Sequence, residues 1–346
     1  MPGVNIPHTP VDRLLVVAPN WLGDAVMALP AIADVVRAWP RTALTVAARS
    51  AVAPLFGMVP GVAAVVPAET LSAQAPYDAV LLLTNSFHSA MSVWRAGIPE
   101  RWGYRRDFRG PLLTRAVAPP IGVHQAQYYQ QLVEALGFSS GPLEPTLHLG
   151  PEVVARAQRM LTEQGWDRTA PLVAFAPGAA YGSAKRWPVA SFADAVRSFQ
   201  ADDVVAVLVG SPADREAGEE LRELLGPGGV TINLIGQTDL PLLAGVLAEC
   251  RALVSNDSGA AHLGAALGVS VTVVFGPTDE RATHPIGRRA PVVLTHKVWC
   301  RPCMLRECPL DHRCMRDLEP TEVFAAAERL LNRFPLPLIA EVRRVA

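Results

Sequence analysis

Short apolar runs alternate with segments of helical period along most of the chain. Runs such as Leu14–Ala18, Leu172–Ala176 and Val204–Gly210 are continuously apolar and rich in valine. This pattern is typical of strands buried on both faces of a parallel sheet. Between such runs, segments such as Asp24–Ala38 and Leu240–Glu249 repeat apolar residues at helical spacing. The alternation predicts βαβ units with right-handed crossovers.

The same pattern predicts further elements and one domain boundary. The further strands are Leu44–Ala48, Ala64–Val66, Ala79–Thr84, Ile232–Ile235, Ala252–Ser255, Val271–Phe275 and Val292–Thr295, and the further helices are Glu152–Gln164, Phe192–Gln200, Ala213–Leu225 and Ala260–Leu267. The alternation is interrupted at Ser139–Pro151, which holds two glycines and three prolines. We therefore expect two doubly wound α/β domains, residues 1–150 and 151–346, that face each other across a cleft. In such sheets ligands bind beyond the carboxyl ends of the strands.

Composition narrows the class of protein. The chain has 346 residues, of which 50% are hydrophobic and 18% charged, with a net charge of -1. A chain of this kind buries a large core, and its neutral balance argues against a broadly basic nucleic-acid binder. No run reaches the roughly 18 apolar residues of a membrane span, and no signal peptide is recognisable. Five cysteines do not make a secreted disulfide scaffold, so we expect a cytoplasmic protein.

The first loop with chemical potential is Asn20–Asp24, which follows the first strand and precedes a helix. Asp24 lies in the first turn of that helix, where aspartate commonly serves as a cap. The alternative is that Asp24 acts as a general base toward an acceptor hydroxyl. Gly23 is the only glycine of this loop, whereas a dinucleotide site needs G-x-G-x-x-G there. The loop therefore argues against NAD.

The second loop, Phe175–Pro188, opens the second domain. Small residues around Gly178 allow a ligand to approach the backbone, and Lys185 and Arg186 add positive charge. The loop lacks G-x-x-x-x-G-K-[ST], which excludes an NTPase P-loop. Phosphate binding and a solvated surface loop remain equal alternatives.

The third stretch, Ser255–Gly264, reads as a strand, a turn and a helix. Asp257 or Ser258 can cap the helix, whose first N–H groups and dipole then form an anion site suited to a diphosphate. His262 lies one turn into the helix. A lone histidine in such a place is more often structural than functional, although its spacing from the turn favours a role.

Two further segments are unusual in composition. Cys300, Cys303, Cys308 and Cys314 lie within fifteen residues, which is compatible with structural zinc, a reversible disulfide pair or reduced packing thiols. The segment of residues 95–115 contains six arginines with interleaved aromatic residues, but only two acidic residues. That segment is either a solvated loop or a surface for an anionic, partly apolar partner.

Together these stretches resemble the lipopolysaccharide heptosyltransferases of glycosyltransferase family 9. The matching sequences are APNWLGDAVMALPAI, RWGYRRDFRGPLLT, PGAAYGSAKRWP and SNDSGAAHLGAALGVSVTVVFGPTDE, and CRPCMLRECPLDHRCM looks most like the heptosyltransferase II branch. The resemblance implies the GT-B fold. It also implies an inverting transfer of L-glycero-D-manno-heptose from ADP-heptose to the inner core of lipopolysaccharide in a Gram-negative bacterium.

The resemblance also implies roles for individual residues. Asp24 matches the catalytic base and Lys185 the lysine at the donor diphosphate, so both are catalytic candidates. The implied donor-binding residues are Gly178, Lys185, Asp214, Asp257, Ser258, Gly259 and His262, with Glu216 as an alternative to Asp214 at the ribose. The predicted acceptor-binding residues are Arg101, Arg105, Arg106 and Arg109.

The resemblance further implies no metal for catalysis, with zinc at the cysteines as a structural alternative. The expected partners are the nucleotide-sugar donor, a lipid A-linked core acceptor and the cytoplasmic face of the inner membrane, and not nucleic acid. The last helix is expected to pack back on the first domain. The alternatives are a heptosyltransferase of type I or III, or a nucleotide-binding protein without catalysis.

Overall fold

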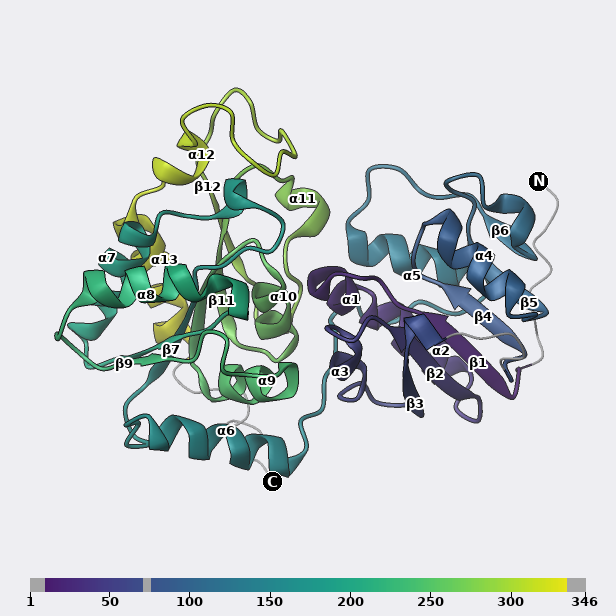
Figure 1. The fold of residues 1–346 in the computed structure, drawn as a ribbon, viewed down its shortest axis with the longest axis horizontal. Helices are drawn as coiled ribbons and strands as arrows, with labels where there is room; N and C mark the ends of the chain where they lie inside the picture. The colour runs from purple at the N-terminus through teal and green to yellow at the C-terminus, as the bar shows by residue number, and fades with distance from the viewer. Residues whose placement is uncertain (1–9, 71–75, 335–346) are drawn as a thin grey trace. The chain divides into compact units, whose positions relative to one another are not determined.

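The computed structural model describes residues 10–70 and 76–334 and divides the chain into two compact units, Met1–His148 and Leu149–Ala346. In each unit, helices cover both faces of a parallel sheet (Figure 1). Within the described ranges, no helix combines the length and the apolar character needed to cross a membrane.

The first unit holds a six-stranded parallel sheet in the order β3-β2-β1-β4-β5-β6. Its strands are β1 (Arg13–Val17), β2 (Ala43–Ala48), β3 (Ala64–Pro67), β4 (Ala79–Leu82), β5 (Glu100–Tyr104) and β6 (Arg115–Val117). Its α-helices are α1 (Leu22–Met27), α2 (Leu29–Ala38), α3 (Ala53–Phe56), α4 (Phe87–Arg95) and α5 (Gln125–Ala135). The central strand β1 pairs with both β2 and β4, so that Leu15 lies opposite Thr45 and Val80.

The second unit repeats this strand order in its own numbering, β12-β11-β10-β7-β8-β9. Its strands are β7 (Leu172–Ala176), β8 (Val205–Leu208), β9 (Thr231–Asn233), β10 (Ala252–Asn256), β11 (Ser270–Phe275) and β12 (Val292–Thr295). Its α-helices are α6 (Pro151–Glu163), α7 (Val189–Gln200), α8 (Arg215–Leu225), α9 (Leu240–Glu249), α10 (Gly259–Ala266), α11 (Glu280–Thr283), α12 (Arg313–Arg316) and α13 (Pro320–Arg333).

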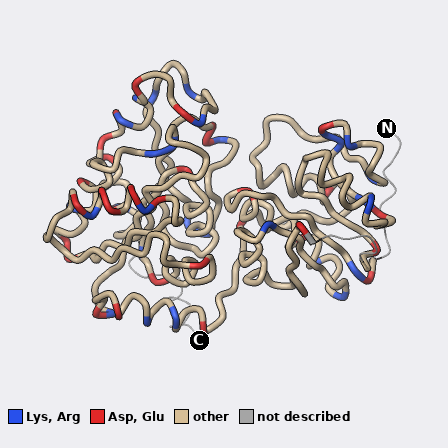
Figure 2. Tube along the Cα trace, in the orientation of Figure 1, with Lys and Arg blue, Asp and Glu red and all other residues tan. Residues whose placement is uncertain are grey.

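The strand residues explain why the second sheet is buried. The strands of the second sheet contain no charged residue, and the charged side chains lie on the helices and loops around them (Figure 2). In β7, β10 and β11 every residue is buried, as expected for strands covered by helices on both faces. Because the buried strands run parallel, the loops that follow them all emerge at the same edge of the sheet.

The predicted strands are confirmed, with ends that differ by a few residues, while several elements were not predicted. The predicted helix Asp24–Ala38 is two helices, α1 and α2, which meet at Ala28. The strands β5 and β6 fall within the arginine-rich segment, where charged residues and Gly103 hide the apolar pattern. The last described helix, α13, packs on α7, β10 and β11 of the second unit, and residues 335–346 lie outside the described residues.

Candidate functional site

The loops of interest emerge where the order of strands reverses in each sheet. In the second unit this point lies between β7 and β10, and in the first unit between β1 and β4. Doubly wound sheets bind ligands at these switch points because neighbouring crossovers diverge there and leave the strand ends open. The loop after β7, which ends in the 3-10 helix η3 (Ser183–Lys185), and the β10–α10 turn with Asp257 both lie at the switch point of the second unit.

Lys185 and Asp257 form a buried ion pair at this point. The Lys185 ammonium contacts Oδ2 of Asp257, and only 12% of the lysine side chain and 5% of the aspartate side chain are exposed. The hydroxyl of Thr278 donates to the same carboxylate oxygen at 2.6 Å. Since an ammonium has three donor hydrogens, Lys185 can hold Asp257 and still bind a phosphate oxygen.

Asn256 ties the two loops together. Its side-chain NH₂ donates to the backbone carbonyl of Pro177 at 2.7 Å, and its side-chain Oδ1 accepts from the backbone N–H of Trp187 at 3.0 Å. Asn256 is fully buried. The sequence placed this asparagine in the turn without assigning it a role, because its two partners lie about seventy residues away in the chain.

The start of α10 supplies backbone donors beside the ion pair. Ser258 occupies the N-cap position, but its side chain makes no capping hydrogen bond, and its hydroxyl lies 3.0 Å from that of Ser255. Ser258 thus occupies the N-cap as predicted, but it makes no side-chain capping bond, and Asp257 bonds to Thr278 and Lys185 instead. The first N–H groups of the helix, from Gly259 onward, point out of its N-terminus. His262 is buried in the first turn.

Asp214 lies under the loop after β7 rather than open to a ligand. Its carboxylate accepts from the backbone N–H and the hydroxyl of Ser211, at 2.9 and 2.6 Å, and lies 3.9 Å from the Arg186 guanidinium. A Cβ on Gly178 would come within 2.2 Å of the Asp214 carboxyl carbon. The glycine is thus required by this close approach, whereas Glu216 is exposed at the start of α8.

In the first unit, Asp24 lies in the first turn of α1. The N-cap residue of that helix is Trp21, so Asp24 is the third helical residue and does not cap it. Asp24 is half-buried, and its carboxylate is close enough to Tyr129 of α5 to affect that phenol. Burial, together with the charge of Asp24, raises the pKa of Tyr129 well above its usual value. The tyrosine therefore remains a neutral neighbour of the carboxylate.

The four arginines predicted for the acceptor fall into two groups. Arg101 donates to the carbonyls of Ile98, Pro99 and Leu112, and Arg109 is fully buried and donates to the carbonyls of Tyr104 and Thr84. Those two guanidinium groups hold the loops after β4 and β5 in place.

Arg105 and Arg106 are exposed and precede Asp107 and Phe108. Both of the latter residues have positive φ, 48° and 59°, which is uncommon for residues other than glycine. Phe108 is 96% exposed at the end of this strained turn. The turn therefore presents two cations and an aromatic ring to solvent.

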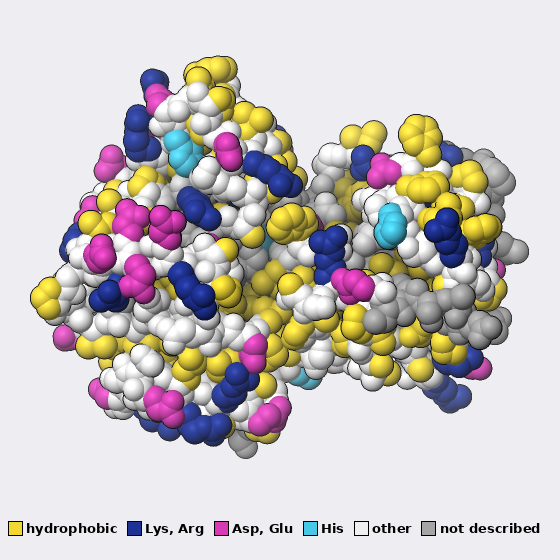
Figure 3. Space-filling view, viewed as in Figure 1, with side chains coloured by type: hydrophobic (Ala, Val, Ile, Leu, Met, Phe, Trp, Pro, Cys, Tyr) yellow, Lys and Arg dark blue, Asp and Glu magenta, His cyan; other side chains and the backbone are white. Residues whose placement is uncertain are grey.

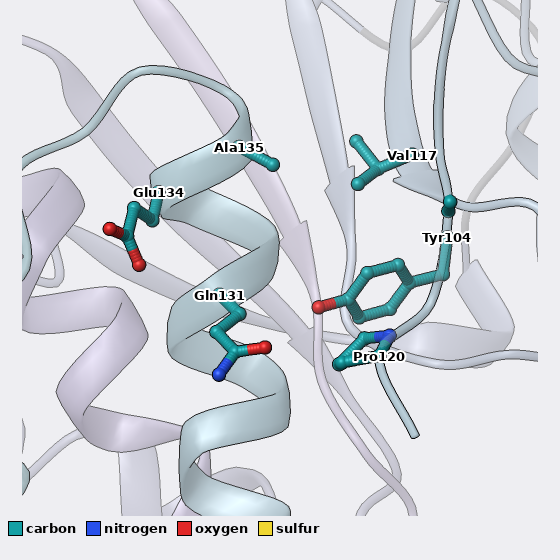
Figure 4. A pocket seen from close by; sticks show the side chains of 7 residues that line it. Tyr104, Val117, Pro120, Gln131, Glu134 and Ala135 are labelled. Carbon is teal, nitrogen blue, oxygen red and sulfur yellow. The ribbon is translucent and has the colours of Figure 1, made fainter. Parts of the chain in front are cut away.

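A pocket of about 380 Å³ lies in the first unit between α5 and the ends of β5 and β6 (Figure 4). Tyr104, Pro120 and Val117 line one side of it, and Gln131, Glu134 and Ala135 of α5 line the other. Its lining carries one carboxylate and no cation. The pocket therefore does not suit an anionic group of a ligand.

The cysteine cluster is not arranged as a metal site. All five cysteines are free, Cys314 is buried and the other three of the cluster are half-buried. Over residues 10–70 and 76–334, no group of three or more His, Cys, Asp or Glu side chains has the geometry to hold a metal ion. The thiols lie near one another, and burial raises the pKa of Cys314 to about 11. A buried neutral thiol packs like a small apolar side chain.

Comparison with known proteins assigns the family. The model of "Glycosyltransferase family 9 (heptosyltransferase)" matches residues 68–313. The chain belongs to glycosyltransferase family 9. It is therefore a glycosyltransferase enzyme, as the motifs indicated.

Individual relatives agree with this assignment. The chain is 29% identical to lipopolysaccharide heptosyltransferase 2 of Escherichia coli K12, over 81% of this chain and 87% of the relative. It is 30% identical to lipopolysaccharide heptosyltransferase 1 of Pseudomonas aeruginosa PAO1, over 86% and 87% of the two chains. The structure of E. coli ADP-heptose lipopolysaccharide heptosyltransferase II matches with a TM-score of 0.79 and 27% identity, over 93% of this chain and 99% of that one. The fold is thus that of the GT-B heptosyltransferases.

Proposed function

We propose that this enzyme moves L-glycero-D-manno-heptose from ADP-heptose to the inner core of lipopolysaccharide, adding the second heptose to heptosyl-Kdo2-lipid A. The observation that carries the proposal is the Lys185–Asp257–Thr278 cluster at the N-terminus of α10, on a sheet switch point. This arrangement combines a cation with backbone donors, as a diphosphate requires. Six relatives, from Escherichia, Salmonella, Haemophilus and Campylobacter, are all named heptosyltransferase 2, which favours this branch over type I or III.

The donor is bound by the second unit. Lys185, Ser258 at the N-cap and the first N–H groups of α10 from Gly259 onward bind the diphosphate and stabilise the charge that develops on the leaving ADP. Since Asp214 is buried and Ser211 holds its Oδ2, the exposed Glu216 is the better candidate for the ribose hydroxyls. His262 is buried one turn below the diphosphate and helps to shape the turn.

The acceptor is bound by the first unit, where Asp24 acts as the general base. Asp24 removes the proton from the attacking hydroxyl, and a single displacement inverts the anomeric carbon. Asp24 is half-buried and lies in the loop and helix start that follow β1, at the β1–β4 switch point where sheets of this kind bind ligands. No resident metal or cofactor takes part in this scheme.

The acceptor is a lipid, so we also propose that the enzyme works in the cytoplasm at the face of the inner membrane. Phe108 and Ile121 are each 96% exposed, and Trp94 is 50% exposed. Hydrophobic side chains lie beside Lys and Arg side chains on the part of the first unit seen in Figure 3. The exposed Phe108, in the same turn as the cations Arg105 and Arg106, matches the chemistry of an anionic lipid surface.

The test is ADP release by the purified enzyme with ADP-heptose and three acceptors. We expect turnover with heptosyl-Kdo2-lipid A and little with Kdo2-lipid A or with an acceptor that already carries both heptoses. Asp24→Asn should reduce turnover by about 10²–10⁴, the range for loss of a general base, and leave ADP affinity unchanged. Asp12→Asn, an exposed aspartate outside the site, is the matched control.

The outcomes separate the alternatives. Turnover with Kdo2-lipid A would assign the enzyme to type I. Binding of ADP without turnover on any acceptor would favour a nucleotide-binding protein instead. An Asp24→Asn variant that keeps more than about a third of wild-type turnover would remove Asp24 from the chemistry.

A further inference from the structure

The cysteine-containing segment, residues 299–316, packs on the loop that carries Lys185. The backbone N–H of Ala184 donates to the carbonyl of Arg306 at 3.0 Å, and the hydroxyl of Tyr181 donates to the carbonyl of Met304 at 2.8 Å. The ring Nε2 of His312 lies 2.7 Å from the carbonyl of Ala184. Three contacts thus fix the segment against the short stretch 181–184.

The segment also reaches the loop after β11. The backbone N–H of Met304 donates to the carbonyl of Pro277 at 2.9 Å. Arg301, only 10% exposed, pairs with Glu280 at 2.9 Å and donates to the carbonyl of Gly276. The segment therefore joins the two loops whose side chains, Lys185 and Thr278, meet at Asp257.

This packing depends on a glycine. A Cβ on Gly182 would come within 2.2 Å of the carbonyl oxygen of Arg306. That oxygen belongs to the backbone and accepts the hydrogen bond from Ala184. Neither of the two segments could therefore move apart without losing this bond. The close approach places the side chain of Arg306 next to the loop of the donor site.

Arg306 and Lys185 contact the same aromatic ring. The Arg306 guanidinium lies 5.3 Å, and the Lys185 ammonium 4.8 Å, from the centroid of Tyr181. Each position is suited to a cation–π interaction. Tyr181 thereby holds a second cation close to the one that the sequence identified.

Arg306 differs from the other arginines of the segment in its partners. Arg301, Arg313 and Arg316 pair with Glu280, Asp311 and Asp317, respectively. Arg306 is exposed, and no carboxylate of the described chain, residues 10–70 and 76–334, forms an ion pair with it. Its guanidinium is therefore available to an anionic ligand.

We propose that Arg306 is a further donor-binding residue that contacts the diphosphate of the nucleotide-sugar. The inference rests on the proposed function, because it assigns a second cation to the same diphosphate site. A diphosphate carries more negative charge than Lys185 can neutralise while it is also paired with Asp257. A guanidinium binds two phosphate oxygens at once, which an ammonium does not. The cysteine segment then serves to place this arginine.

The experiment measures ADP and AMP binding to the full-length protein by calorimetry. Arg306→Ala should weaken ADP binding by about tenfold or more, the loss expected for a charge-assisted hydrogen bond, and should weaken AMP binding less. Arg306→Lys should fall between the two proteins because it keeps charge but loses the paired contact. Arg313→Ala, an exposed arginine of the same segment, should bind ADP within twofold of wild type.

Each result decides a different point. No ADP binding by the wild type overturns the proposed function and, with it, this inference. Binding by the wild type and equal binding by Arg306→Ala overturns only the inference. An equal loss for ADP and AMP, with a lowered melting temperature, makes Arg306 a structural residue and also overturns it.

Discussion

Partners decide what an arginine can do in this protein. Arg109 is fully buried with two backbone carbonyls as acceptors, and burial lowers its pKa to about 10. Arg105, four residues earlier, is exposed beside Phe108. The two arginines thus differ in role: Arg109 donates to backbone carbonyls inside the unit, whereas Arg105 faces solvent.

This difference predicts opposite effects of two substitutions. Arg109→Ala should lower the free energy of unfolding by about 1–3 kcal/mol, because the carbonyls of Thr84 and Tyr104 lose their donor. Arg105→Ala should leave stability unchanged and raise the acceptor KM, with a smaller effect at high salt. Urea unfolding and acceptor kinetics at two salt concentrations measure both. An unchanged acceptor KM for Arg105→Ala and Arg106→Ala would show that the acceptor is held elsewhere.

The buried Lys185–Asp257 ion pair leads to a second prediction at the scale of the residue. Lys185→Ala should weaken ADP binding by roughly 1.5–3 kcal/mol. It should also destabilise the fold by about 3 kcal/mol, because it leaves the Asp257 carboxylate buried without its cation. The double variant Lys185→Ala with Asp257→Asn should recover stability but not ADP affinity. Calorimetry and thermal unfolding separate the two effects, and wild-type ADP affinity in Lys185→Ala would exclude the lysine from the site.

At the scale of elements, the loop after β7 is held from both sides. Asn256 binds its start and its end, Asp214 lies beneath Gly178, and the cysteine segment packs on residues 181–184. Only at its end does the loop contribute a large side chain, Trp187, to the core of the second unit. Its conformation is therefore set by β10, η4 (Pro212–Asp214) and the cysteine segment.

Gly178→Ala tests this arrangement. The added methyl group collides with the Asp214 carboxyl, which Ser211 holds in place, so the loop or the carboxylate has to move. We expect a loss of about 1–3 kcal/mol in unfolding free energy and weaker ADP binding. Gly228→Ala, where the added Cβ has no neighbour within 4 Å, is the control. Equal stabilities of the two variants would mean that the loop yields freely.

At the scale of the whole molecule, the two units repeat one architecture with different chemistry. Both sheets have the same strand order, yet the switch point of the first carries Asp24 and that of the second carries a buried ion pair. The buried titratable groups of the two units also set how stability depends on pH. Burial raises the pKa of Tyr104 and Tyr129 in the first unit.

We therefore predict a loss of stability in alkali. Above about pH 10 the unfolded chain releases the tyrosine protons while the folded chain retains them, so the free energy of unfolding falls as pH rises. Each such tyrosine contributes a slope of about 1.4 kcal/mol per pH unit. Tyr129→Phe should remove one such slope between about pH 10.5 and 11.5 in denaturant titrations.

The comparison with Tyr129→Phe isolates the tyrosine. The lowered pKa of Arg109 acts with the opposite sign, since its loss of a proton in the folded state favours folding as pH rises. Arg109 is present in both proteins, so its contribution cancels in the difference. Equal slopes for wild type and Tyr129→Phe would show that Tyr129 ionises in the folded protein.

The sequence by itself determined which segments become strands and helices and where the candidate loops lie. Buried parallel strands need continuous apolar runs, and that requirement is local, so β7, β9, β10 and β12 were found from their own residues. The strands β5 and β6 were missed because Glu100, Arg101, Gly103 and Arg115 interrupt the run of apolar residues in them. Asp24, Lys185 and Asp257 were found because they lie in the segments that follow buried strands, where polar residues stand out from the apolar pattern.

Only the tertiary structure decided which of those residues are open to a ligand. The strand order brings Lys185 to Asp257, buries Arg109 against the carbonyl of Thr84 and places Asp214 beneath Gly178. It also seats Arg306 against Tyr181, more than a hundred residues away in the chain. These outcomes depend on contacts between segments that are distant in the chain, and such contacts form only when the sheets are assembled. The spacing of apolar residues along the chain therefore does not predict them.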